Sequence, residues 1–249
     1  MAHEEAKKRS PRVAWVESRV RERYSTSRLL DVGFVGTYQE PFLHLAIRSQ
    51  NPRAQIIGVD INVREMLKRR LSNVVGARAE SLGFKENAFE VVLCLELLEH
   101  VYSPMNILLE FWRVLRPGGN LILTTPNAWS WWNFARHWMT GSLTSRSQRK
   151  VYRHYLGDAD HKQFYDPLSL MNLLDDAGFE IVEAVTKNHA VPVLRRWSKS
   201  FDLLDWQFYP MNRIGHYLCL VAKKAHAPRV RNTEGPELRS AGEPKRAEL

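Results

Sequence analysis

The most informative segment of the chain reads Phe89-Glu90-Val91-Val92-Leu93-Cys94-Leu95-Glu96-Leu97-Leu98-Glu99-His100-Val101. Its first part is a continuous apolar run, which is typical of a strand buried on both faces of a sheet. Three ionisable residues, Glu96, Glu99 and His100, follow that run directly. In open α/β sheets ligands bind beyond the carboxyl ends of the strands, so these side chains are candidates for a functional site. The alternative is that Glu99 and His100 only brace the segment that follows.

Similar apolar runs alternate with helical patterns along the rest of the chain. The other expected strands are Arg28–Val32, Gln55–Val59, Asn73–Ala77, Asn120–Thr125, Glu180–Thr186 and His216–Ala222. Apolar residues recur with helical spacing over 13–27, 39–49, 63–71, 103–115 and 167–177. This alternation predicts an α/β fold with a Rossmann-like, mostly parallel sheet covered by helices on both faces.

One domain over 13–225 accounts for this pattern, and 249 residues are enough for its core. The charged N-terminus 1–12 and the tail 226–249, which is rich in Pro, Gly, Arg and Glu, are expected to be disordered. Between them, residues 128–160 form a Trp-rich insertion after the fifth expected strand.

The formal net charge is +9, with basic clusters at Lys7–Arg28, Arg146–Arg153 and Arg195–Lys199. No recognised nucleic-acid-binding module is present, so nucleic acid is disfavoured as a partner. An acidic substrate or an anionic membrane surface is the preferred functional interpretation, and a solvated basic surface is the alternative.

Cellular location is constrained by three weak signals. Cys94 and Cys219 lie in apolar runs typical of buried strands, which disfavours a disulfide framework and fits a reducing compartment. The N-terminus has no signal-peptide pattern, and no apolar run is long enough to span a bilayer. We expect a cytoplasmic protein that has, at most, peripheral membrane contact.

Two further motifs follow expected strands. In Leu29-Leu30-Asp31-Val32-Gly33-Phe34-Val35-Gly36-Thr37 a strand ends in an acid and enters a turn with two glycines, which allow close approach of a ligand. Such a turn is also common as plain architecture. At the end of the next strand, Asp60 can accept hydrogen bonds from both hydroxyls of a ribose. The alternative is that Asp60 caps the next helix, a role that Asn62 can also fill.

A fourth motif contains no candidate catalytic residue, but it helps to identify a family resemblance. Leu115-Arg116-Pro117-Gly118-Gly119 is expected to turn from a helix into the strand before Thr125-Pro126-Asn127. Taken in order, the motifs over 28–127 resemble those of the class I S-adenosylmethionine-dependent methyltransferases. The nearest group includes the ubiquinone-biosynthesis O-methyltransferases and many glycan- and lipid-modifying relatives. The resemblance resumes over His161–Glu183.

The resemblance implies a seven-stranded sheet whose last strand is antiparallel, and S-adenosylmethionine as cofactor. It assigns cofactor binding to Asp31, Gly33, Gly36, Asp60, Ile61, Ala79, Glu80, Leu95 and Glu96. Two positions depart from the family pattern. Val35 and Thr37 replace the second and third glycines of the first loop, with Gly36 displaced by one, and Arg78 replaces an adenine-binding Asp.

For catalysis the candidates are two histidines. An oxygen acceptor needs a base, and His100 and His161 are expected to supply it because imidazole titrates near neutrality. The resemblance also implies a link between the Glu-x-x-Glu-His pattern, here Glu96, Glu99 and His100, and a divalent cation in the quinone O-methyltransferases. Other features of that group are not evident, so we expect no metal.

The acceptor is expected to meet the insertion 128–160, which carries aromatic and basic side chains: Trp129, Trp131, Trp132, Phe134, Trp138, Arg146, Arg149, Lys150 and Arg153. They suit a small-molecule, saccharide or isoprenoid-linked acceptor, or membrane contact through 129–153; an aromatic subdomain core is the alternative. The leading function is therefore O-methylation. A degenerate, non-catalytic binding protein is the competing hypothesis, and a nicotinamide-dependent oxidoreductase is disfavoured by the glycine pattern.

Overall fold

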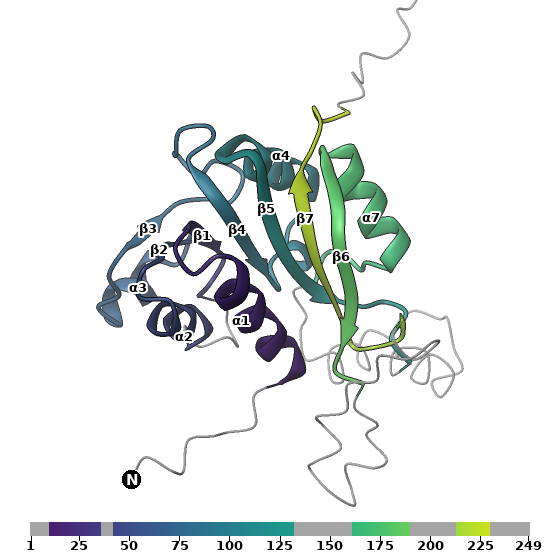
Figure 1. The fold of residues 1–249 in the computed structure, drawn as a ribbon, viewed down its shortest axis with the longest axis horizontal. Helices are drawn as coiled ribbons and strands as arrows, with labels where there is room; N and C mark the ends of the chain where they lie inside the picture. Colours follow the sequence, from purple (N-terminus) through teal and green to yellow (C-terminus); the bar gives the residue numbers. More distant parts are fainter. Residues whose placement is uncertain (1–9, 36–41, 132–160, 190–212, 230–249) are drawn as a thin grey trace, which may run out of the picture.

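The computed structural model describes residues 10–35, 42–131, 161–189 and 213–229, and these form one seven-stranded sheet (Figure 1). The strands lie in the order β3-β2-β1-β4-β5-β7-β6. Their bounds are β1 Arg28–Val32, β2 Gln55–Asp60, β3 Val74–Gly76, β4 Phe89–Leu95, β5 Leu115–Pro126, β6 Phe179–Lys187 and β7 Tyr217–Lys224.

The direction of the strands agrees with the expectation from the sequence. The pairs β1–β2, β2–β3, β1–β4 and β4–β5 are parallel. Strand β7 is inserted between β5 and β6 and runs antiparallel to both. The mostly parallel sheet with an antiparallel last strand is therefore confirmed.

Helices cover both faces of this sheet, as expected (Figure 1). Side chains of β4 alternate between the faces: Val91, Leu93 and Leu95 pack with α1 and α2, while Val92 and Cys94 pack with α4 and α7. The helices are α1 Pro11–Arg23, α2 Phe42–Gln50, α3 Val63–Lys68, α4 Pro104–Val114 and α7 Pro167–Asp176, with the short 3-10 helix η1 at Leu98–His100. Continuous apolar runs are needed because both faces of each central strand are buried.

Strand β5 begins earlier than expected. The Arg116-Pro117-Gly118-Gly119 stretch, expected to be a turn, lies within β5, where Leu115 already pairs with Phe89. The register then shifts before Asn120 pairs with Val91, and Gly118 takes a φ of 73°. A bulge of this kind uses glycine to absorb extra residues without ending the ladder.

Both chain ends are ordered further than expected. Helix α1 begins at Pro11, with the Ser10 hydroxyl accepting from the Val13 amide, so Pro11 and Arg12 are helical. At the other end, the His226 amide donates to the Gly178 carbonyl, and residues 226–229 stay against the domain. These contacts are polar, so apolar periodicity could not reveal them. The remaining residues of 1–12 and 226–249 lie outside the described part.

Two further expectations concern bulk properties. Cys94 and Cys219 are both buried thiols. No helix in the described part of the chain is long and apolar enough to cross a bilayer. The insertion is described only at 128–131, so the aromatic and basic residues expected to face an acceptor or a membrane lie mostly outside the described residues.

Candidate functional site

Glu96 stands at the carboxyl end of β4 in an unusual conformation. Its φ is 54°, a left-handed value that side chains other than glycine rarely adopt. Its amide donates to the Thr124 carbonyl at 2.9 Å, and its carboxylate accepts from the Thr124 hydroxyl at 2.8 Å. Burial raises the pKa of Glu96 above its ordinary value. Backbone strain concentrates at functional sites, where surrounding contacts stabilise it.

Arg12 is the site residue that the sequence did not reveal. It comes from the first turn of α1, and its side chain is only 12% exposed. The guanidinium lies 3.4 Å from the Glu96 carboxylate and stacks over the ring of Tyr217. Burial opposes its charge, but the charge of Glu96 and of other acidic neighbours outweighs burial and raises the pKa of Arg12. The only signal in the sequence was the Ser10-Pro11 helix start, which places Arg12 inside the helix.

Glu99, in η1, is the second buried acid of the site. The Thr125 hydroxyl donates to its Oε2 at 3.0 Å, while its buried Oε1 has no hydrogen-bond partner among the described residues. Burial first, and then the charge of Glu96, raise the pKa of Glu99 to about 8. A carboxyl group of this kind is held neutral near physiological pH unless a cation approaches it.

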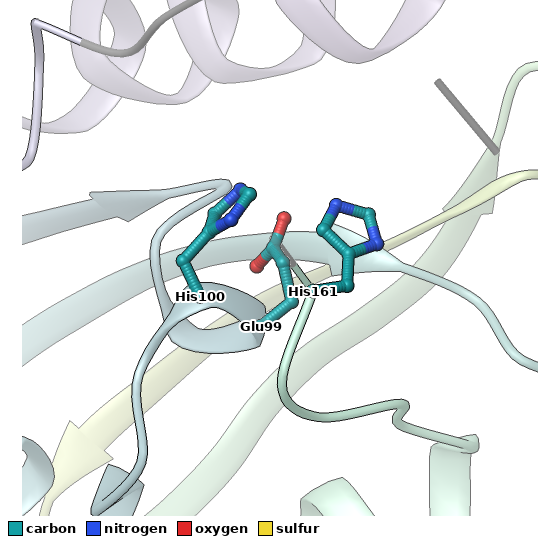
Figure 2. Close-up of side chains that lie close together, drawn as sticks. All are labelled: Glu99, His100 and His161. Atoms are coloured by element: carbon teal, nitrogen blue, oxygen red, sulfur yellow. The ribbon is translucent and has the colours of Figure 1, made fainter. Parts of the chain in front are cut away.

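The segment after residue 160 crosses over this acid. The amides of Lys162 and Gln163 donate to the Glu99 carbonyl at 2.6 and 3.0 Å, which anchors the crossing. As a result His161 lies beside His100, with ring centroids 4.8 Å apart (Figure 2). The two histidines expected as bases, 61 positions apart in the chain, are thus brought together.

The metal-ligand set implied by the Glu-x-x-Glu-His pattern is not the set that the structure groups. One ligand atom each from Glu99, His100 and His161 lie within 4.8 Å of one another. Glu96 does not belong to this group, because its carboxylate is held by Arg12 and Thr124. His161 takes the place expected for Glu96.

Asp60 lies at the carboxyl end of β2 and organises the loop after β1. Its carboxylate accepts from the amides of Val35 and Asn62, each at 2.8 Å. Burial raises the pKa of Asp60, although the two amides favour the charged form. Asn62 caps α3, so Asp60 is not the cap of that helix. Ile61 beside it is 71% exposed, which leaves a bare apolar surface next to the carboxylate.

Gly33 and Asp31, two of the residues expected to bind the cofactor near the first loop, differ in their surroundings. Gly33 has a φ of 75°, and a Cβ there would stand 2.8 Å from Leu97, so this position requires glycine. The Asp31 carboxylate accepts a hydrogen bond from Nδ1 of His44 at 2.8 Å, and both side chains are buried. This contact joins the end of β1 to α2 across the loop that connects them. Gly36 lies outside the described residues.

The remaining expected contacts are weaker. Glu80 lies 3.4 Å from Arg78, so the two residues that flank Ala79 form an ion pair. Ala79 packs partly against the core. Leu95 is buried with α1 and α2, so only its backbone faces the carboxyl edge of the sheet. Ala79 and Leu95 have apolar side chains, so these two positions could contact a cofactor only through the backbone.

Comparison with known proteins identifies the family. A family model described as a methyltransferase domain matches residues 6–184. The ubiquinone biosynthesis O-methyltransferase of Idiomarina loihiensis is 29% identical over 141 residues, which are 51% of this chain and 53% of that enzyme. The chain therefore matches about half the length of this relative.

Two solved structures are among those that share the fold. One is described as an S-adenosylmethionine-dependent methyltransferase, possible histamine N-methyltransferase, from Thermotoga maritima. It is 20% identical to this chain with a TM-score of 0.59, and the match covers 85% of this chain and 89% of that chain. The other is the [4+2]-cyclase SpnF, which is 20% identical with a TM-score of 0.55. That match covers 87% of this chain and 81% of the SpnF chain. This fold thus supports more than one reaction. The chain belongs to the methyltransferase-domain family, and the resemblance to class I S-adenosylmethionine-dependent methyltransferases is confirmed.

Proposed function

We propose that this protein transfers the methyl group of S-adenosylmethionine to a hydroxyl of a small-molecule acceptor. The observation that carries the proposal is the arrangement along one edge of the sheet. Asp60 lies at the end of β2, the Arg12–Glu96 pair at the end of β4, and the His100–His161 pair immediately after it. A cofactor site therefore adjoins a pair of groups able to accept a proton.

The adenosine half of the cofactor fits the end of β2. A carboxylate offers about four acceptor positions, and Asp60 uses two of them for the amides of Val35 and Asn62. The remaining positions suit the two ribose hydroxyls. The exposed side chain of Ile61 provides an apolar surface for one face of the adenine ring. Val35 contributes through its backbone, which lessens the importance of the lost glycine.

The amino-acid half of the cofactor carries an ammonium and a carboxylate. Arg12 and Glu96 supply one buried group of each opposite sign at the end of β4. In this proposal Arg12 binds the cofactor carboxylate, Glu96 binds the ammonium, and Gly33 permits close approach of the methionine chain. Their mutual pairing in the structure keeps both charges compensated when no cofactor is bound.

Methyl transfer is an in-line displacement on the sulfonium. The acceptor oxygen forms a bond to the methyl carbon, and the electron pair of the carbon–sulfur bond moves to sulfur, which leaves S-adenosylhomocysteine. The hydroxyl proton passes to His100 or His161. Because the sulfonium is already reactive, positioning and exclusion of water are the other contributions of the protein.

The acceptor we propose is a planar small molecule. Near the histidines the described residues expose aromatic side chains, with Phe164 6.1 Å from His161 between ring centroids. Tyr102 is exposed beside Lys162, which lies 5.6 Å from its ring. Aromatic surfaces of this kind favour stacking with a flat acceptor. The similarity to a ubiquinone biosynthesis O-methyltransferase points in the same direction.

Calorimetric titration with S-adenosylmethionine tests the cofactor half of the proposal. Asp60→Asn is expected to weaken binding by about 10-fold or more, because a charged acceptor of the ribose hydroxyls is lost. Glu65→Gln, an acid nearby on α3 that pairs only with Lys68 and Arg69, is the matched control and should bind like the wild type. Equal affinity of all three proteins would contradict the assignment of Asp60.

Turnover requires a second measurement. Wild-type protein with cofactor labelled in the methyl group is incubated with a panel of phenolic and aliphatic hydroxyl compounds, and the products are analysed by mass spectrometry. Label in an ether product supports O-methylation. Tight cofactor binding with no labelled product from the panel or from a host extract would favour a non-catalytic binding protein.

A further inference from the structure

We infer that Glu99, His100 and His161 form a binding site for a divalent transition-metal ion of the zinc type. Two imidazoles and one carboxylate from two separate chain segments meet here, each offering a ligand atom within 4.8 Å of the others. No other such group of three occurs among the described residues. The role of the ion in methyl transfer rests on the proposed function, whereas its binding does not.

The separations are those of a site close to metal-binding geometry. Ligand atoms about 2.1 Å from a tetrahedral metal lie about 3.4 Å from each other. The ligand atoms, which lie within 4.8 Å of one another, must therefore approach by up to about 1.4 Å. The two imidazoles are half-buried and can move by side-chain rotation. Their backbones are already held together, because the Glu99 carbonyl accepts from the amides of Lys162 and Gln163.

A second observation points to a cation at this place. The Oε1 atom of Glu99 is buried and has no hydrogen-bond partner among the described residues. Figure 2 shows this carboxyl group between the rings of His100 and His161. A buried carboxyl oxygen without a hydrogen-bond partner is costly, and a bound cation removes that cost.

Glu96 cannot replace His161 as the third ligand. Its carboxylate accepts from Thr124 at 2.8 Å and lies 3.4 Å from the guanidinium of Arg12. A divalent cation at Glu96 would face that positive charge. The ligand set therefore differs from the Glu-x-x-Glu-His pattern by one imidazole in place of a carboxylate.

This difference determines the kind of metal. Magnesium prefers oxygen ligands in near-octahedral geometry, whereas imidazole suits zinc, cobalt, nickel and iron. Two histidines and one carboxylate leave open positions, and an acceptor hydroxyl can occupy one of them. A bound ion would act there as a Lewis acid for the acceptor oxygen, in place of a free imidazole base.

Cobalt titration of chelator-treated, full-length protein tests the site directly. Co²⁺ bound by imidazole gives visible absorption bands, so binding is read without any acceptor or turnover. We expect saturation at a single equivalent, competition by Zn²⁺, and no competition by Mg²⁺ at the same concentration. His161→Gln should weaken Co²⁺ binding by about 10–100-fold. Glu96→Gln should still bind a single equivalent of Co²⁺, because the Glu96 carboxylate is held by Arg12 and Thr124 and is not a ligand.

The control for adventitious imidazole binding is His226→Gln. His226 lies 3.3 Å from Asp175 on the surface, an exposed histidine–carboxylate pair outside the proposed site. The His226→Gln variant should bind Co²⁺ like the wild type. Circular dichroism should show that every variant is folded.

Three results would overturn the inference. They are an absence of Co²⁺ bands in the wild type, loss of binding in Glu96→Gln with retention in His161→Gln, and equal competition by Mg²⁺ and Zn²⁺. Titration of the same samples with S-adenosylmethionine separates failure of the metal site from failure of the proposed function.

Discussion

Gly33 and Gly83 both have a left-handed backbone conformation, but the space around their Cα atoms differs. Their φ angles are 75° and 71°, so a side chain is strained at either position. At Gly83 a Cβ would meet nothing within 4 Å, whereas at Gly33 it would stand 2.8 Å from a methyl carbon of Leu97. Gly33 therefore serves both the turn after β1 and its close packing against the segment after β4.

The comparison gives a prediction at the scale of the residue. Gly83→Ala should lower the free energy of unfolding by about 1 kcal/mol through backbone strain alone. Gly33→Ala should lower it by about 1–3 kcal/mol more, because the added methyl overlaps Leu97. Urea denaturation measures both, and Leu97→Ala in the Gly33→Ala background should recover part of the difference. Equal effects of the two glycine substitutions would exclude the contact with Leu97 as a cause.

At the scale of the element, a cluster of hydrogen-bonded polar side chains connects helix α1 to strand β6. The Glu183 carboxylate accepts from the Arg19 guanidinium at 2.7 to 3.0 Å and from the Trp15 indole at 3.0 Å. Burial alone would raise the pKa of Glu183, but these hydrogen bonds and the charge of Arg19 outweigh it and lower the pKa. This cluster positions the helix that carries Arg12 into the site.

We therefore expect Glu183→Gln to destabilise the protein by about 1–3 kcal/mol at pH 7. A carboxylate with a lowered pKa contributes stability above its unfolded pKa and loses it as pH falls through the folded pKa. The difference between wild type and variant should shrink below about pH 4. Denaturant titrations at several pH values measure it, with the exposed Glu180→Gln of the same strand as control. A difference that does not change with pH would mean that the charge of Glu183 is not involved.

At the scale of the whole molecule, the proposed cofactor site joins three strands and α1, so ligand binding should stabilise the domain as a unit. At a hundred times its dissociation constant, S-adenosylmethionine should add about 2.7 kcal/mol. For a domain of this size that corresponds to a rise in Tm of about 5–10 °C. Differential scanning fluorimetry checks this, and NADH at the same concentration should produce no shift. A shift with NADH alone would revive the oxidoreductase hypothesis.

Local patterns in the sequence determined the architecture. Strands β1 and β4 have the predicted bounds because apolar runs of that length and composition are buried wherever a parallel sheet forms. Asp60, Glu96, Glu99 and His100 lie at the carboxyl edge because each comes at or just after the end of a parallel strand. Other element boundaries differ from the predicted ones, as at the start of β5. These boundaries are set by polar caps and bulges, which depend on pairing partners rather than on apolar periodicity.

Which of these side chains lie next to one another depends on how the helices and strands pack. This packing brings Arg12 of α1 to Glu96, places His161 against His100, and pairs Asp31 with His44. Each of these pairs joins residues on different elements, and no periodic pattern encodes the angle at which two elements meet. The fold, the family and the edge of the sheet that carries the candidate site could all be predicted from the sequence. The packing of α1 and of the segment after residue 160 decided the composition of the site, because charge pairing and burial are properties of neighbours in space.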